Sequence, residues 1–490
     1  MSFLDWCIVG CYMVATISLG LWVSRSNKNA RDYLLGGGQM NWIVVGVSMI
    51  ATSMSASTFL GFPSHSYSNN FAPLLYQVGA LVSVLVVTTL FIRHYRQTGI
   101  ESAYALLELR FSRSVRVLGA SLYCMHLLLR SGILIFGPAL VLSKATGMGM
   151  TPTICIIAVV SMVYTAFGGL KAVVLTDAIQ FVVLMLGAVL TLFVLNHHGG
   201  LAQLWEVASS AGHTALIPAD AGIKEMIDPR AADSLLSAVV VYTVLEIAIR
   251  GCDQQFVQRY IACSSTASAV RSSYLSILLG IPAAFMFYSI GALLFGFYST
   301  LPGGVEVMKG NDAYPTFIIT YLPSGIRGLL VAALFAASMS SFDSAINALN
   351  NTALVDLLGR KGNDPNGLKI ARLMSIPWGV LALVAALCAA AAGTGLLYQA
   401  LYFTSLFTGP LLAMMTMAFY CSHWHSRSVI GGVIIGITGL FLCSPPAFLD
   451  WYPPVASWPY NPLISCAGTW LGAALVENIA RHFLPTTRPS

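Results

Sequence analysis

Two apolar stretches of this chain carry an unusual number of hydroxyl side chains. One contains Ala51-Thr-Ser-Met-Ser-Ala-Ser-Thr58 and the other contains Ala336-Ala-Ser-Met-Ser-Ser-Phe-Asp-Ser344. In the second, small and hydroxyl-bearing residues recur at spacings of three and four, on one helix face beside Asp343: Ala337, Ser340, Ser341 and Ser344. Hydroxyls with one carboxylate supply the oxygen ligands and negative charge that a small hard cation needs. The segment therefore predicts a cation site, because close helix packing through small residues alone would not require the aspartate.

The first hydroxyl-rich segment favours a broken helix. Ser and Thr side chains compete for backbone hydrogen bonds, and Gly61 and Pro63 follow in the same stretch. A break would release backbone carbonyls that can bind an ion. The alternative is an unbroken helix packed closely through its small residues.

Few ionisable side chains lie within the apolar stretches. Of the 19 acidic residues, we place only Asp177, Glu246 and Asp343 there, and Arg130 is the one deeply placed cation. Such residues cost at least ~2.5–3.5 kcal/mol each at bilayer depth and usually mark a function. Glu246 and Arg250 are four residues apart and could simply pair. Arg130 has no acid on its own helix, so it is either an anion ligand or a packing residue bound to another acid such as Glu246.

The composition requires elements that lie in a membrane. The chain has 490 residues, of which 57% are hydrophobic and 9% charged, whereas soluble proteins carry about 25% charged residues. A soluble enzyme, a nucleic-acid-binding protein and a disordered scaffold are therefore poor interpretations. Stretches of about 20 apolar residues predict membrane-spanning helices. We predict thirteen, at 6–24, 41–63, 74–92, 117–142, 153–168, 172–195, 235–252, 274–298, 325–347, 373–392, 396–420, 429–445 and 461–476.

Positive charge is distributed unevenly between the two sets of loops. Of the 25 Lys and Arg residues, 19 fall in one set and 5 in the other, and Arg130 lies within a span. Lys and Arg favour cytoplasmic loops. We therefore expect a multi-pass protein of the plasma or inner membrane, with its N-terminus outside and its C-terminus in the cytoplasm.

Several motifs, in order along the chain, resemble the sodium:solute symporter family. They are Asp32-Tyr-Leu-Leu-Gly-Gly-Gly38, Gly168-Gly-Leu-Lys-Ala-Val-Val-Leu-Thr-Asp177 with Gln180, Asp253-Gln254 with Val257-Gln-Arg-Tyr260, and Ser340-Ser-Phe-Asp-Ser-Ala-Ile-Asn347. The resemblance implies an all-α, five-plus-five inverted repeat of the leucine-transporter type, with broken helices at spans 2 and 7. The implied division is 1–40 (first span and loop), 41–196 (first repeat), 197–234 (extracellular loop), 235–420 (second repeat) and 421–490 (accessory spans and tail).

The resemblance also implies where sodium binds. The main site would use backbone carbonyls of Ala51, Met54 and Ala337 with the hydroxyls of Ser340 and Ser341. A second sodium, present in some members, would correspond to Asp177, Ser340, Asp343 and Ser344. Asp343 stands where well-described two-sodium members carry a hydroxyl. Two carboxylates could hold the second cation more tightly, share a proton or abolish the site.

For the solute, the resemblance points to a cavity lined by Ser53, Ser55, Thr58, Gln77 and Arg130. Sialic acid carriers have similar cavity residues, whereas the motifs at 54–64 and 170–174 are more similar to the iodide, monocarboxylate and vitamin branch. Both branches carry anions, and a guanidinium group suits a carboxylate. We expect a sodium-coupled symporter, functioning as a monomer in the bilayer, that imports a carboxylate or acidic sugar. The alternatives are a neutral sugar carrier and, in another class, a membrane-embedded transferase.

Overall fold

Helices form nearly all of the described chain. In this computed structural model the described residues are all except 55, 218–221, 231–233, 302–309, 361–363, 365, 393–394, 446–454, 456 and 484–490. The long helices are α1 (Phe3–Ser24), α8 (Arg113–Thr146), α9 (Met150–Gly199), α14 (Thr266–Ser299), α16 (Ile326–Asn351), α17 (Gly367–Ala392), α18 (Gly395–Tyr420), α19 (Ser426–Cys443) and α20 (Asn461–Phe483). The all-α prediction is confirmed for these residues.

Shorter helices connect or extend the long ones. They are α2 (Ala30–Leu35), α3 (Trp42–Ser53), α4 (Ala56–Ser68), α5 (Tyr76–Val86), α6 (Ile92–Thr98), α7 (Ala105–Arg110), α10 (Leu201–Ser210), α11 (Ile223–Met226), α12 (Tyr242–Cys252), α13 (Gln254–Ala262) and α15 (Gly310–Thr320). Wider π-type turns at Val87–Phe91, Ser237–Val241 and Thr352–Leu357 join helices without ending them.

Within the described chain, eight helices are long and apolar enough to cross a membrane, or nine if one bent pair is a single span. The multi-pass prediction is confirmed at this level. The predicted spans outside that set fall on α8, on the apolar segments Met150–Met162 and Ser405–Tyr420, and on 237–252.

The hydroxyl-rich stretch at 51–58 lies where two helices meet. α3 ends at Ser53 and is capped by Met54, which leaves helical geometry with φ −88° and ψ 86°. The helix pair Trp42–Ser53 and Thr58–Ser68 is bent by 55°. A helix end leaves backbone carbonyls without partners inside the helix. Carbonyl oxygens are therefore concentrated at this bend.

A second interruption lies inside α9, at Gly169. Its φ of 65° and ψ of −176° are non-helical, and a Cβ there would lie 2.6 Å from the Tyr33 carbonyl oxygen. Both facts require glycine. The kink coincides with the boundary predicted between spans 5 and 6, and it sets the directions of the two halves that carry Thr165 and Asp177.

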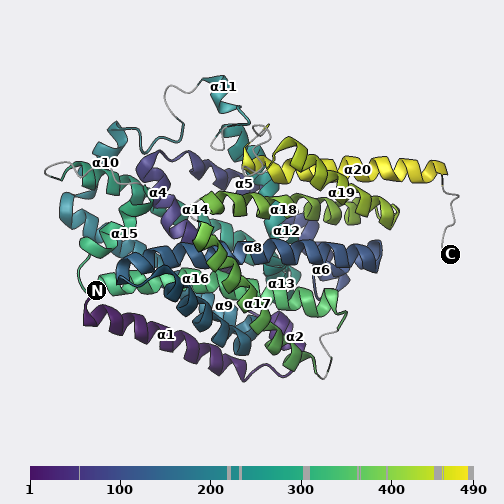
Figure 1. Cartoon of the computed structure of the whole chain (residues 1–490), viewed down its shortest axis with the longest axis horizontal. Coiled ribbons are helices and arrows are strands. Elements are labelled where there is room, and N and C mark those ends of the chain that lie inside the picture. Colours follow the sequence, from purple (N-terminus) through teal and green to yellow (C-terminus); the bar gives the residue numbers. More distant parts are fainter. Residues whose placement is uncertain are drawn as a thin grey trace.

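α16 lies in the interior of the bundle (Figure 1), where 94% of its most apolar window is buried, against 22% for α1. It packs against α9, α1, α8 and α17. At its start, Asp5 of α1 accepts hydrogen bonds from the amides of Gly325 (2.8 Å) and Gly328 (3.0 Å). The hydroxyl-rich face at 337–344 is therefore held at the centre of the protein by several long helices.

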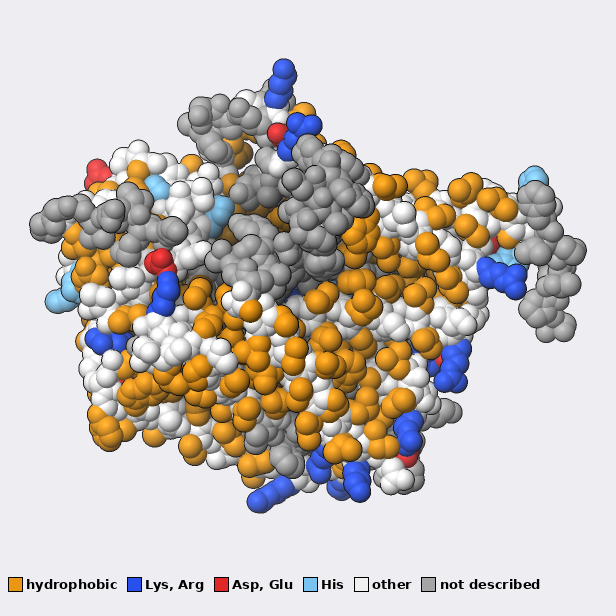
Figure 2. Space-filling model, viewed as in Figure 1, with side chains coloured by type: hydrophobic (Ala, Val, Ile, Leu, Met, Phe, Trp, Pro, Cys, Tyr) orange, Lys and Arg blue, Asp and Glu red, His pale blue; other side chains and the backbone are white. Residues whose placement is uncertain are grey.

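Hydrophobic side chains cover the middle of the face drawn in Figure 2, and Lys and Arg side chains lie toward its edges. Exposed side chains on α1, α9, α14 and α17 include Val14, Val182, Leu278 and Leu373. In Figure 1, α1 begins at the left of the molecule and α20 ends at the right. An exposed apolar band with charged ends is the surface that a bilayer requires.

Candidate cation and solute site

The bend after α3 packs against the middle of α16. Ala51, Met54 and Ala337 belong to one buried apolar cluster, and none is more than 4% exposed. The hydroxyls of Thr52 on α3 and Ser344 on α16 are 3.2 Å apart. The structure thus brings together the two segments from which the main sodium site is predicted.

The two predicted hydroxyl ligands of that site are both buried. Ser341 Oγ is 3.3 Å from the carbonyl oxygen of Ala337, itself a predicted ligand, and Ser340 Oγ has no hydrogen-bond partner among the described residues. Their exposed fractions are 2% and 1%. A buried hydroxyl without a partner costs free energy, which an ion bound to its oxygen would offset.

Asp177 forms an ion pair that the sequence did not reveal. The Arg259 guanidinium donates to Asp177 Oδ2 at 2.8 Å and to Ser344 Oγ at 2.7 Å. Ser48 Oγ donates to the same carboxylate oxygen at 2.6 Å and accepts from Arg259 Nε at 2.9 Å. All four side chains are fully buried. The network joins α3, α9, α13 and α16 at one point.

Arg259 lies in the connection between two predicted spans, where the charge count puts it, but its side chain is fully buried there. It sits on α13, a helix too short and too polar to register as a span, so hydropathy placed it in water. The Val257-Gln-Arg-Tyr260 motif was the available signal. Because Arg259 neutralises Asp177, two unpaired carboxylates do not face each other here.

Asp343 has a different environment. Thr165 Oγ1 lies 3.0 Å from Asp343 Oδ1, while Oδ2 has no hydrogen-bond partner among the described residues, and no basic side chain there lies within ion-pairing distance. The residue is fully buried. A carboxyl group in this position requires a cation or a proton for charge balance.

The predicted solute residues that the structure describes lie on four helices, one of them α8 with Arg130. Ser53 ends α3 and bonds to the Met49 carbonyl at 3.1 Å, Thr58 lies on α4, and Gln77 lies on α5; all three are partly buried. Ser55 lies outside the described residues. α5 packs closely on α12, where the rings of Tyr76 and Tyr242 stack 3.6 Å apart.

Arg130, on α8, has an acidic partner in the protein. Its Nη1 lies 3.7 Å from Oδ2 of Asp253, which begins α13 and also accepts from the Tyr123 hydroxyl at 2.6 Å. Glu246, the acid named in the structural alternative, is instead paired with Arg250 at 2.7 Å, as its spacing predicted. The Arg130 contact is long, and 26% of the side chain remains exposed.

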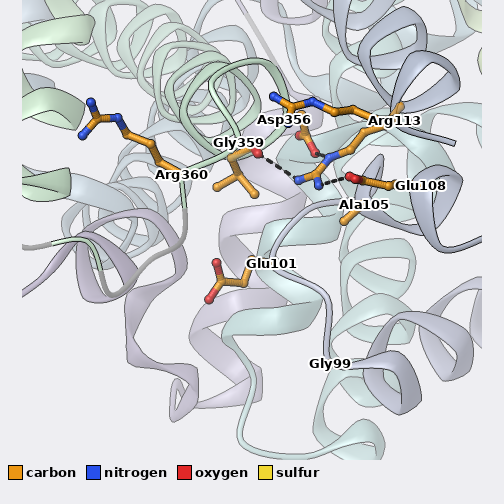
Figure 3. Close-up of a pocket in the computed structure, with 10 residues that line it drawn as sticks. Gly99, Glu101, Ala105, Glu108, Arg113, Asp356, Gly359 and Arg360 are labelled. Carbon is orange, nitrogen blue, oxygen red and sulfur yellow. Dashed lines mark hydrogen bonds and ion pairs between the residues drawn. The ribbon is translucent and has the colours of Figure 1, made fainter.

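A separate polar cavity of about 420 Å³ lies at the C-terminal end of α16. Arg116 bridges its acids, donating to Asp356 Oδ1 at 2.7 Å and to Glu108 Oε2 at 2.6 Å. Figure 3 shows these two carboxylates turned toward the same guanidinium, with Glu101 lying apart from them. These ion pairs join α7, α8 and the π-type turn at Thr352–Leu357 that follows α16.

Comparison with known proteins gives a consistent result over nearly the whole chain. A model of the sodium:solute symporter family matches residues 33–436. The sodium-coupled monocarboxylate transporter 2 of Danio rerio is 27% identical over 484 residues, covering 96% of this chain and 76% of that protein. The sodium/sialic acid symporter of Proteus mirabilis is 26% identical over 447 residues, covering 89% of this chain and 88% of that protein.

The fold is also similar to a solved structure. A Na⁺-coupled sialic acid symporter in a substrate-bound, outward-open state superposes with a TM-score of 0.86 and 24% identity, covering 98% of both chains. At that identity the likeness establishes the fold.

Proposed function

The chain belongs to the sodium:solute symporter family and is a sodium-coupled transporter rather than an enzyme, and from this we propose that its solute is a small organic anion. The observation that carries the proposal is Arg130, a partly exposed guanidinium on α8 whose only acidic contact within the described part of the chain is 3.7 Å long. A solute carboxylate could form shorter, bidentate hydrogen bonds with it. The relatives named for monocarboxylates and sialic acid support the same class.

We propose thirteen spans, arranged as two inverted repeats at 41–196 and 235–420, with broken helices at spans 2 and 7. The 55° bend after Ser53 supports the first break. The π-type turn at Ser237–Val241 and the extended Asp253 lie at the two ends of span 7. The protein would function as a monomer in the bilayer, with the N-terminus outside. The charge asymmetry and the opposite positions of the start of α1 and the end of α20 support that orientation.

The main sodium ion, we propose, binds between the bend after α3 and the middle of α16. Its ligands would be the carbonyls of Ala51, Met54 and Ala337 and the hydroxyls of Ser340 and Ser341. Burial of all five and the unpartnered Ser340 hydroxyl support this set. Because the ion would join α3 to α16, sodium binding would stabilise one arrangement of these helices and so couple to solute binding.

The solute class is tested by uptake into proteoliposomes. A labelled monocarboxylate, sialic acid and glucose are compared under equal inward gradients of Na⁺ and of K⁺. The proposal predicts sodium-driven uptake of one of the two anions and none of glucose. Uptake of glucose alone would establish the neutral sugar alternative.

The main site is tested with Ser341→Ala. Loss of one oxygen ligand should raise the sodium concentration for half-maximal uptake about tenfold or more. The matched control is Ser338→Ala, because that buried hydroxyl bonds only to the Leu334 carbonyl, at 2.7 Å. Equal sodium affinity in Ser341→Ala and wild type would show that the ion binds elsewhere.

A further inference from the structure

Four buried tyrosine hydroxyls converge on the junction between α12 and α13. α12 ends at Cys252, and Asp253 continues the chain in extended geometry, with φ −74° and ψ 124°. A helix that ends in this way leaves its last carbonyl groups without partners inside the helix. Three of the tyrosines donate to these carbonyls: Tyr260 to Arg250 (3.0 Å), Tyr95 to Gly251 (2.5 Å) and Tyr104 to Cys252 (2.9 Å). The break in the helix is therefore fixed by side chains from several elements.

The fourth tyrosine, Tyr123 of α8, donates to the Asp253 side chain instead, with its hydroxyl 2.6 Å from Oδ1. The backbone amide of Gln255 donates to the same oxygen at 2.8 Å, and the Gln255 side chain donates to Oδ2 at 3.1 Å. Hydrogen bonds to the charged form of a carboxyl group stabilise that form. The position and charge of Asp253 are thus supported by neutral donors.

Tyr123 and Arg130 approach Asp253 from one face of α8, because they are seven residues apart and so about two helical turns. Arg130 Nη1 lies 3.7 Å from Asp253 Oδ2, which is beyond hydrogen-bond distance. A small cavity between α8, α12 and α18 borders Tyr123 and Asp253. The carboxylate therefore has room to turn if the Tyr123 hydroxyl is removed.

We infer that Tyr123 is a positioning residue for the solute site: its hydroxyl holds Asp253 away from Arg130 and so keeps the guanidinium available to a solute carboxylate. This rests on the proposed function, in which Arg130 binds the solute. A carboxylate that is free to turn toward a guanidinium forms a direct, charge-assisted hydrogen bond with it. A solute would then have to displace Asp253 before it could bind.

The experiment measures binding of lactate and of sialic acid to the purified full-length protein in saturating Na⁺, by isothermal titration calorimetry. For the anion that wild type binds, Tyr123→Phe should lower the affinity about tenfold or more, the strength of one hydrogen bond between charged groups. Adding Asp253→Asn to Tyr123→Phe should restore the affinity, because an asparagine does not form the competing ion pair.

Tyr104→Phe is the matched control. Its hydroxyl is as deeply buried and donates to the neighbouring Cys252 carbonyl, so the variant loses one hydrogen bond from the same junction without releasing Asp253. Its anion affinity should equal that of wild type. A loss of affinity in Tyr123→Phe that Tyr104→Phe shares, or that Asp253→Asn does not reverse, would make Tyr123 a structural residue and overturn the inference.

Arg130→Ala separates this inference from the proposed function. If Arg130→Ala binds the anion weakly while Tyr123→Phe binds it as wild type does, only the role given to Tyr123 is wrong. Equal affinity in Arg130→Ala and wild type would instead overturn the proposed solute site. If Tyr123→Phe does not fold, Gln255→Ala decides in its place, because it removes the donor from the oxygen that faces Arg130 and should lower the affinity in the same direction; an unchanged affinity would contradict the inference.

Discussion

Arg130 lies where a solute carboxylate and a protein carboxylate would compete for one guanidinium. Asp253 holds it at 3.7 Å, and the same carboxylate caps α13 by accepting from the Gln255 amide at 2.8 Å. A loaded solute site would draw the guanidinium toward the solute, and an empty one would leave it with Asp253. In the proposed cycle, Asp253 would thus balance the charge of Arg130 between transport events.

We predict that Arg130→Ala lowers solute affinity at least tenfold. Truncating one side of a buried charge pair costs about 2–5 kcal/mol. Arg130→Lys should recover part of the affinity, since it restores the charge without the planar fork. Sodium binding without solute should not change. Both affinities can be measured by isothermal titration calorimetry.

Asp253→Asn separates the solute role of Arg130 from a packing role. Asparagine caps a helix nearly as well as aspartate, so α13 should be preserved while the competing charge is removed. Solute affinity should then equal or exceed that of wild type. If Arg130→Ala and Asp253→Asn instead lower the melting temperature alike and leave affinity unchanged, Arg130 serves only to hold α13.

The sequence predicted the burial of Asp343 but not the partner of Asp177. Asp343 stands among hydroxyls within a long apolar segment, where its burial follows from hydropathy. Arg259 stands in a polar segment, and its burial depends on α3, α9 and α16 closing over it. Contacts between residues 82 and 85 positions apart cannot be read from local composition.

At the scale of elements, Gly169 determines the course of the longest helix. The non-helical Gly169 lies between the segments 153–168 and 172–195 that the sequence predicts as spans 5 and 6. The direction that the chain takes at Gly169 was not predictable from the apolar pattern, because it depends on packing against a distant segment. At the kink the backbone of Gly169 lies so close to Tyr33 that a Cβ atom at position 169 would be 2.6 Å from the Tyr33 carbonyl oxygen.

Gly169→Ala should destabilise the protein by more than about 1–3 kcal/mol, the usual cost of a residue forced into glycine-only geometry. The clash with Tyr33 adds to that strain. Gly187→Ala, on the same helix, is the control, because its Cβ would be in ordinary contact, 3.5 Å from Ala333 Cβ. Melting temperatures in detergent provide the measurement, and equal values for the two variants would contradict the role given to Gly169.

At the scale of the whole molecule, the number of ions determines how transport responds to voltage. One Na⁺ carried with one monovalent anion moves no net charge. A second Na⁺ makes each cycle carry one positive charge, worth roughly 2.3 kcal/mol per 100 mV.

We therefore predict that an inside-negative potential accelerates uptake of a monovalent solute by wild type. Asp343→Asn should transport, if at all, without this acceleration. Proteoliposomes with a potassium diffusion potential test both proteins, and the control variant Ser338→Ala should respond as wild type does. Uptake by wild type that is indifferent to the potential would contradict two-ion coupling.

The spacing of the Arg259 contacts along the chain has a consequence for biosynthesis. Asp177 precedes Arg259 by 82 residues, whereas Ser344 follows it by 85. At roughly 5–20 residues per second, Ser344 leaves the ribosome about 4–17 s after Arg259. Asp177 and Arg259 can therefore neutralise each other before α16 exists, and the nascent protein need not hold either charge unpaired in the bilayer while α16 is still being made.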